Sequence, residues 1–126
     1  MKSINCPCES GFDYESCCKP YHTNLSNPLT PVALMRSRYS AYVLQLIDYL
    51  LDTTHIANRY LHDRDAIGIW AKRNLWLGLE ILEAEANTVQ FKAFYKCDNK
   101  ISIHHEVSTF KIENGRWYYY SGVYFD

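Results

Sequence analysis

Apolar and polar residues alternate with a period of two through residues 75–120, LWLGLEILEAEANTVQFKAFYKCDNKISIHHEVSTFKIENGRWYYY. This alternation is typical of strands that bury one face. Turn-forming residues separate the runs at Asn87, at Asp98-Asn99 and at Asn114-Gly115. Asn-Gly is the strongest short signal for a tight hairpin. The stretch therefore predicts four antiparallel strands in sequential order.

One face of the predicted sheet carries most of the apolar side chains. Residues two apart in a strand share a face, and we expect this face to cover the core. Its members are Leu75, Leu77, Leu79, Ile81, Val89, Phe91, Ala93, Tyr95, Ile101, Ile103 and Val107. His105 falls on the same alternation, so we expect its imidazole to point inward and the neighbouring Glu106 to point to the other face.

The residues before the strands have helical periodicity. Thr30 can cap a helix and Pro31 suits its first turn. An apolar stripe at spacings of three, four and one predicts a long amphipathic helix, broken near Asp48; it comprises Val32, Met35, Tyr39, Tyr42, Val43, Leu46 and Leu50. Residues 53–62 are expected to form a loop, and residues 63–74 a shorter helix. Helices followed by a strand meander predict an α+β fold, with one helix packed across a curved antiparallel sheet.

Four of the five cysteines lie close together near the amino terminus, in the stretch CPCESGFDYESCC at residues 6–18. The pattern C-x-C-x8-C-C gives two close pairs joined by a loop that can fold back on itself. Four thiolates are the ligands that closed, structural zinc sites use. A disulfide between adjacent cysteines is strained, and a reducing compartment disfavours disulfides. We expect one structural zinc ion, and a metal-free redox cluster is the alternative.

The cysteine-rich segment is too short to fold on a hydrophobic core alone, so metal binding must supply its order. The polar stretch at residues 23–30, with Pro28, reads as a linker. We therefore divide the chain into a metal-binding motif at residues 1–22, a linker at 23–30 and an α+β domain at 31–126. We expect the last of these to fold without the first.

The amino-terminal stretch resembles the SEC-C motif, named for the carboxy-terminal zinc segment of the SecA preprotein translocase. The resemblance rests on CPC, Ser10-Gly11, Tyr14 and the Cys17-Cys18 pair. It implies zinc, with His22 as a possible substitute for Cys18; the implied ligands are Cys6, Cys8, Cys17 and Cys18. The chain departs from the motif at Glu9, where glycine is usual, and in being acidic rather than lysine-rich between the cysteine pairs.

The remainder resembles the YchJ-like family. The segments ALMRSRYSAYVLQLIDYLL, HHEVSTF and GRWYYYSG carry this resemblance. It implies a SEC-C motif joined to a cone-shaped domain similar to nuclear transport factor 2, a cystatin-like arrangement. The family has no established activity, so the resemblance implies a fold and a metal but no reaction.

Composition and charge narrow the function classes. Hydrophobic residues make up 48% of the 126 residues, enough for a real core, and 13 Lys+Arg against 14 Asp+Glu give a net charge of −1. Without an overall basic field, nucleic acid is an unlikely partner. No apolar run approaches a membrane span, and the opening MKSINCPCES has no signal-peptide core. We expect a cytoplasmic protein with no membrane association.

The candidate pocket lies between the helix and the sheet. We expect it to be lined by Arg36, Tyr42, Trp70, Tyr95 and His105. Arg36 can reach the pocket mouth and Arg38 lies on the other flank of the helix stripe. Both could bind an anion, and the alternative is a solvated flank or a structural bond to strand carbonyls and Glu106. The remaining histidines, His55, His62 and His104, show no metal-ligand spacing and are expected at the surface.

Two functions fit this pocket. The first is a binding module for a protein partner or a small ligand; the second is an enzyme using His105 for acid-base chemistry. We favour binding, because His105 lacks an inward carboxylate beside it and a zinc ion with four protein ligands cannot activate water. The oligomeric state does not follow from the sequence.

Overall fold

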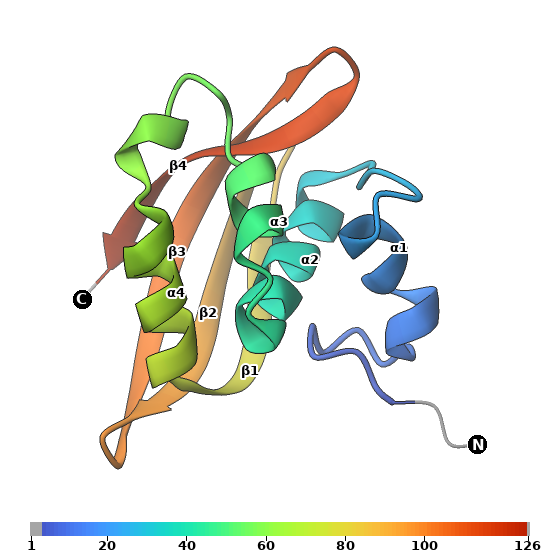
Figure 1. The fold of residues 1–126 in the computed structure, drawn as a ribbon. Helices are drawn as coiled ribbons and strands as arrows, with labels where there is room; N and C mark the ends of the chain where they lie inside the picture. The colour runs from blue at the N-terminus through green and yellow to red at the C-terminus, as the bar shows by residue number, and fades with distance from the viewer. Residues whose placement is uncertain (1–3, 126) are drawn as a thin grey trace.

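The computed structural model describes residues 4–125, so the predicted boundaries at residues 1 and 126 lie outside the described part. Its elements, in order, are η1 Tyr14–Ser16, α1 Lys19–His22, α2 Pro31–Leu44, α3 Ile47–Asp52, η2 Arg59–Leu61, α4 Arg64–Arg73, β1 Leu75–Ala84, β2 Thr88–Cys97, β3 Lys100–Glu113 and β4 Arg116–Phe125. Helices α2, α3 and α4 lie over one face of the sheet, and the cysteine-rich segment lies beyond α2 (Figure 1).

The sheet is the predicted antiparallel meander, with strand order β1-β2-β3-β4. The fold class, α+β with a helix across an antiparallel sheet, is confirmed. The turns also fall where predicted. Asp98, Asn99, Asn114 and Gly115 all have positive φ angles, which Asn, Asp and Gly tolerate better than other residues.

The first long helix begins at the predicted Thr30 cap, but the break comes earlier than expected. The Thr30 side chain accepts a hydrogen bond from the Ala33 amide, and Asp63 does the same for α4 through the Ala66 amide. The long helix ends at Leu44 because Gln45 adopts a left-handed conformation, with φ 59°. Residues 53–62 form the expected loop, with the single short turn η2 inside it.

The predicted inward face of β3 is wrong. Ile101 and Ile103 are 66% and 52% exposed, and His105 shares their face. The buried face of β3 instead carries Glu106, at 4% exposure, together with Ser108 and Phe110. Aliphatic residues occupy the outer face of this strand, so hydrophobicity alone selects the wrong set.

The predicted face of β1 is correct only in its second half. The pairing with β2 shifts between Trp76 and Gly78, which leaves Leu77 without a partner in the ladder. A bulge of this kind changes which residues point to a given face. Leu75 and Leu77 are consequently exposed and Leu79 is buried, while Trp76 packs against the core.

The main core lies between α2 and the middle of the sheet. Leu34, Met35 and Tyr39 of α2 pack with Phe91 of β2 and Phe110 of β3, among others. In the described residues, no helix is both long and apolar enough to cross a membrane.

Candidate functional site

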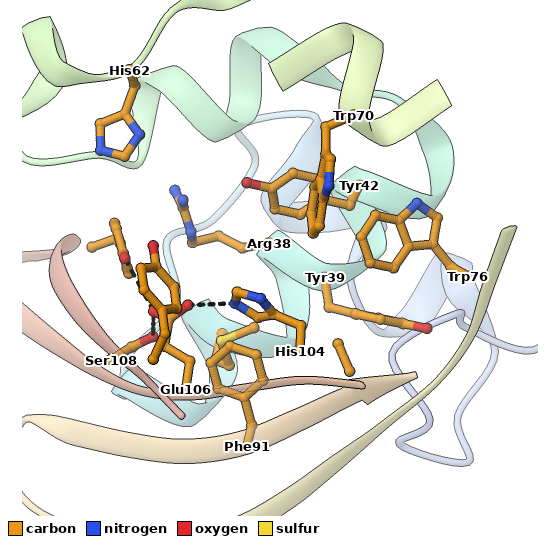
Figure 2. Close-up of a pocket in the computed structure, with 14 residues that line it drawn as sticks. Arg38, Tyr39, Tyr42, His62, Trp70, Trp76, Phe91, His104, Glu106 and Ser108 are labelled. Atoms are coloured by element: carbon orange, nitrogen blue, oxygen red, sulfur yellow. Dashed lines mark hydrogen bonds and ion pairs between the residues drawn. The ribbon is translucent and has the colours of Figure 1, made fainter. Parts of the chain in front are cut away.

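A cavity of about 310 Å³ opens between α2, α4 and the sheet, next to the main core. Tyr42, Trp70 and Trp76 form an aromatic wall, with neighbouring ring centroids 5.0–5.7 Å apart. The opposite side is polar and is made by Arg38, His104 and Glu106 among others (Figure 2). The cavity therefore combines a flat apolar surface with a small number of charged and hydrogen-bonding groups, which is the usual composition of a small-molecule site.

Glu106 is the buried centre of the polar side. Its Oε2 accepts hydrogen bonds from Ser108 Oγ at 2.5 Å and from the Tyr119 hydroxyl at 3.0 Å, and its Oε1 lies 2.7 Å from His104 Nε2. Three donors thus surround one carboxyl group. Such hydrogen bonds compensate the cost of removing a carboxylate from water.

His104 is paired with Glu106 and lines the cavity. A carboxylate only accepts hydrogen bonds, so the His104 Nε2 at 2.7 Å carries the proton. In the neutral imidazole, Nδ1 is then the nitrogen with the free lone pair. The ring lies among aromatic side chains, with its centroid 5.1 Å from Tyr124 and 5.9 Å from Trp70.

Arg38 supplies a positive charge from α2. Its side chain is 7% exposed, and Nη1 donates to the Leu50 carbonyl at 2.9 Å and to Thr53 Oγ1 at 2.7 Å. The guanidinium carbon lies 4.6 Å from the centre of the Tyr119 ring, a cation–π arrangement. All hydrogen bonds that Arg38 makes within residues 4–125 use Nη1, which leaves Nε and Nη2 as free donors.

Burial tunes the other titratable groups of the cavity. It raises the pKa of Tyr42, Tyr119 and Tyr124, so these hydroxyls stay protonated at neutral pH. It lowers the pKa of His62, and the nearby Arg38 charge lowers it further. His62 therefore lines the cavity as a neutral ring.

The structure brings together only part of the predicted pocket. Tyr42 and Trp70 line the cavity, and Tyr95 lies behind the wall, 5.7 Å from the rings of both Trp70 and Trp76. Arg36 does not reach the cavity, because its Nη1 donates to the Cys8 carbonyl at 2.6 Å on the other side of α2. His105 lies on the outer face of the sheet, where its Nε2 is 2.9 Å from Gln90 Nε2.

The sequence interpretation named Arg38 only on a flank of the helix stripe, and it missed His62, His104 and Glu106 as cavity residues. The expectation that His62 and His104 lie on the surface is wrong. His55 does lie outside the cavity, 2.7 Å from the Glu113 carboxylate. The sequence did contain a signal for His104 and Glu106. Residues two apart in a strand share a face, so the polar His104, Glu106 and Ser108 lie on the same face as the large aromatic Phe110. The argument that no inward histidine has an inward carboxylate beside it also fails, because His104 and Glu106 share the inner face.

The cysteine cluster is compact, and three of its four cysteines are buried while Cys17 is partly exposed. The Sγ atoms of Cys6, Cys8, Cys17 and Cys18 all lie within 4.8 Å of one another. Cys8 and Cys17 are 3.6 Å apart and Cys17 and Cys18 are 3.9 Å apart, measured between sulfurs. Four sulfurs bound to one zinc ion at 2.3 Å would lie about 3.8 Å apart. The geometry is compatible with a metal ion.

The electrostatics of the cluster also suit a cation. A hydrogen bond with Cys18 lowers the pKa of the Cys8 thiol, and that same interaction raises the pKa of Cys18. Burial raises the pKa of Cys17. One thiolate is therefore favoured, whereas further thiolates need a positive charge beside them. Hydroxyl groups support the sulfurs, since Ser40 Oγ donates to Cys18 at 3.4 Å and Ser10 Oγ lies 3.2 Å from Cys17.

His22 lies outside this cluster and joins it to α2. Its Nε2 donates to the Ser37 carbonyl at 2.8 Å, and its Nδ1 accepts from the Tyr14 hydroxyl at 2.8 Å. Both ring nitrogens are thus engaged, and His22 does not substitute for Cys18.

Glu9, at the position where the motif usually has glycine, adopts the left-handed conformation with φ 68°. The turn therefore forms without glycine at this position.

A model of the family described as "YchJ, middle NTF2-like domain" matches residues 30–122. The chain belongs to the YchJ-like family. It is 40% identical over 120 residues to a UPF0225 protein of Actinobacillus succinogenes, covering 90% of this chain and 78% of the relative. It is 43% identical over 121 residues to a UPF0225 protein of Haemophilus influenzae, covering 91% and 74%.

Two solved structures are similar in fold to this YchJ-like chain over most of its length. A SEC-C motif containing protein from Rhodopseudomonas palustris has 37% identity and a TM-score of 0.89, covering 98% of this chain and all of the other. A SEC-C motif containing protein from Psychrobacter arcticus has 35% identity and a TM-score of 0.80, covering 92% and 80%. The resemblance stated from the sequence, to the YchJ-like family with a SEC-C motif, is confirmed.

Proposed function

We propose that this YchJ-like protein binds a small organic molecule in the cavity between α2, α4 and the sheet. The observation that carries this is the buried guanidinium of Arg38 in a space walled by Trp70 and Trp76. Among the described residues, its hydrogen bonds leave two donor nitrogens free. A buried cation with free donors favours an oxygen acceptor on a ligand. The enclosed volume favours a small ligand over a protein segment.

The charges of the cavity favour an uncharged acceptor. The positive charge of Arg38 is offset by the Glu106 carboxylate on the facing strand, so a full anion would gain attraction from one and repulsion from the other. A carbonyl oxygen accepts from Arg38 without that repulsion. We therefore assign to the ligand a flat apolar body and one carbonyl group.

Binding of 2-tetralone, a bicyclic ketone, tests this function, with tetralin as the matched hydrocarbon that lacks the oxygen. In a calorimetric or ligand-observed NMR titration, 2-tetralone should bind more tightly than tetralin, and Trp70→Ala should weaken its binding at least about tenfold. His105→Ala, on the outer face, is the control and should change nothing. Equal affinity of the two compounds, or binding indifferent to Trp70→Ala, would contradict the proposal.

We further propose that the cysteine cluster holds one structural zinc ion. Four soft ligands at tetrahedral spacing support zinc, and a closed set of protein ligands supports a structural rather than a catalytic role. Free thiols at this density also support a reducing compartment, the cytoplasm.

Metal analysis of freshly purified, reduced protein should find one zinc ion per chain. The zinc should be lost in Cys17→Ser but not in Cys97→Ser, whose sulfur is outside the cluster. Stoichiometric binding that survives Cys17→Ser would count against the assignment.

A further inference from the structure

We propose that the cavity is also a catalytic site, in which His104 removes a proton from the carbon next to the carbonyl group of the bound ligand. This inference rests on the proposed function, because it needs a carbonyl compound in the cavity. Glu106 acts as a positioning residue for His104, and Arg38 binds the carbonyl oxygen as it becomes negative. The reaction class is proton transfer α to a carbonyl, and its net outcome is an isomerisation.

The base is defined by its tautomer. Because Glu106 holds the proton on His104 Nε2 at 2.7 Å, Nδ1 is the basic nitrogen of the neutral ring. Within residues 4–125, no hydrogen bond to His104 Nδ1 is present, and the ring lines the cavity beside Trp70 and Tyr124. A general base needs this combination of a free lone pair and access to the ligand.

Glu106 is held so that it cannot take another role. Ser108 and Tyr119 both donate to its Oε2, which leaves Oε1 for His104. The negative charge beside Nε2 stabilises the imidazolium that forms when Nδ1 takes up a proton. A carboxylate placed in this way holds the histidine in one tautomer and one orientation without contacting the substrate.

The negative charge that develops on the ligand meets a donor that is already in place. Arg38 on α2 and His104 on β3 project into the same cavity from opposite elements (Figure 2). The three residues Leu50, Thr53 and Thr54 fix Arg38 through Nη1. Donors fixed before the reaction stabilise an oxyanion without reorganisation.

The step balances without a cofactor. The α-carbon loses a proton to His104 Nδ1, its C–H electron pair becomes the carbon–carbon double bond of an enolate, and the carbonyl π electrons move to the oxygen facing Arg38. The imidazolium then returns the proton to the same carbon or to a conjugated one. No oxidant, reductant or second substrate is required.

Deuterium exchange tests the chemistry directly. In D2O, the protein should accelerate exchange of the α-protons of 2-tetralone above the buffer rate, saturably, as followed by proton NMR. His104→Gln should reduce the protein-dependent rate by roughly 10²-fold or more, the usual contribution of a general base. His105→Gln is the matched control, an adjacent histidine on the opposite face, and should retain the full rate.

Glu106→Gln separates positioning from a merely structural role. It keeps the size of the side chain but removes the charge, so the maximal exchange rate should fall roughly tenfold or more while half-saturation by 2-tetralone stays unchanged. Saturable 2-tetralone binding with no acceleration by the wild-type protein overturns this inference and leaves the proposed function intact. Absence of binding overturns both. Acceleration that His104→Gln does not reduce also overturns the assignment of the base.

Discussion

A single added methyl group at Gly122 on β4 would disturb the hydrogen bonds that Ser108 and Tyr119 donate to the buried Glu106. Gly122 pairs with Ser108 on β3. A Cβ atom placed on Gly122 would collide with the Glu106 carboxylate, and it would lie 2.7 Å from the Tyr119 hydroxyl. Real Cβ atoms do not approach other atoms so closely, and Gly122→Ala must therefore displace Glu106 or Tyr119.

The expected cost follows from the hydrogen bonds at stake. Displacement separates Glu106 from at least one of its two hydroxyl donors, and a hydrogen bond to a charged group contributes about 1.5–3 kcal/mol. Replacing glycine by alanine in a strand recovers about 0.5–1 kcal/mol of chain entropy. The net loss of unfolding free energy in Gly122→Ala should be about 1–2 kcal/mol.

Urea unfolding followed by tryptophan fluorescence measures this difference. Gly78→Ala is the matched control, because it lies in strand β1 and its added Cβ would meet nothing closer than 3.6 Å. We expect Gly78→Ala to be more stable than wild type by about 0.5–1 kcal/mol, because it recovers the same chain entropy without a collision. The Gly122→Ala cost should also shrink when Glu106 is replaced by alanine, because the atoms that it meets are then gone.

Two results would refute the reasoning about Gly122. One is a Gly122→Ala protein as stable as the Gly78→Ala protein. The other is a full Gly122→Ala cost that persists in the Glu106→Ala background, which would place the strain elsewhere in β4. Either result would mean that the Glu106 network is looser than the structure describes.

Three further outcomes are expected. Burial lowers the pKa of His22 from its ordinary value near 6.5, so the folded protein resists protonation of this ring. The unfolding free energy, measured by urea titration at each pH, should therefore be highest above pH 6.5 and fall as the pH drops below that value. The fall should be smaller in His22→Gln. Deleting residues 1–22 should leave a folded domain with a lower midpoint in thermal unfolding, because Ser40 loses its sulfur partners; an unchanged midpoint would show that the contact contributes nothing. Chelation should weaken 2-tetralone binding in the wild type but not in the truncated protein, and equal weakening in both would point to an effect of the chelator on the cavity itself.

The order and limits of the elements were largely predictable from sequence because their signals are local. Thr30 and Asp63 cap helices through bonds within three residues, and Asn114-Gly115 adopts the left-handed angles that its turn requires. The helix break was misplaced by three residues, since nothing in the hydrophobic stripe distinguishes Gln45 from a helical residue.

The inner face of β3 was not predictable by the same reasoning. Ile101 and Ile103 make the outer face more aliphatic than the inner one, and the buried Glu106 on the inner face is compensated by donors from β3 and β4. Tyr119 reaches Glu106 from a different strand, and a single sequence does not display that contact. Periodicity identifies two faces of a strand, whereas long-range hydrogen bonds decide which of them is buried.

Helix α2 contacts both the cysteine cluster and the cavity. Consecutive residues from Ser37 to Ala41 are all buried, so this helix is covered on more than one side. The Ser37 carbonyl accepts a hydrogen bond from His22 and Ser40 Oγ donates to Cys18, so α2 contacts the cysteine-rich segment, whereas Arg38 and Tyr39 line the cavity. A helix buried on two sides cannot shift toward one neighbour without losing contacts with the other. The cysteine-rich segment therefore helps to hold α2, the helix that carries Arg38, in its position over the sheet.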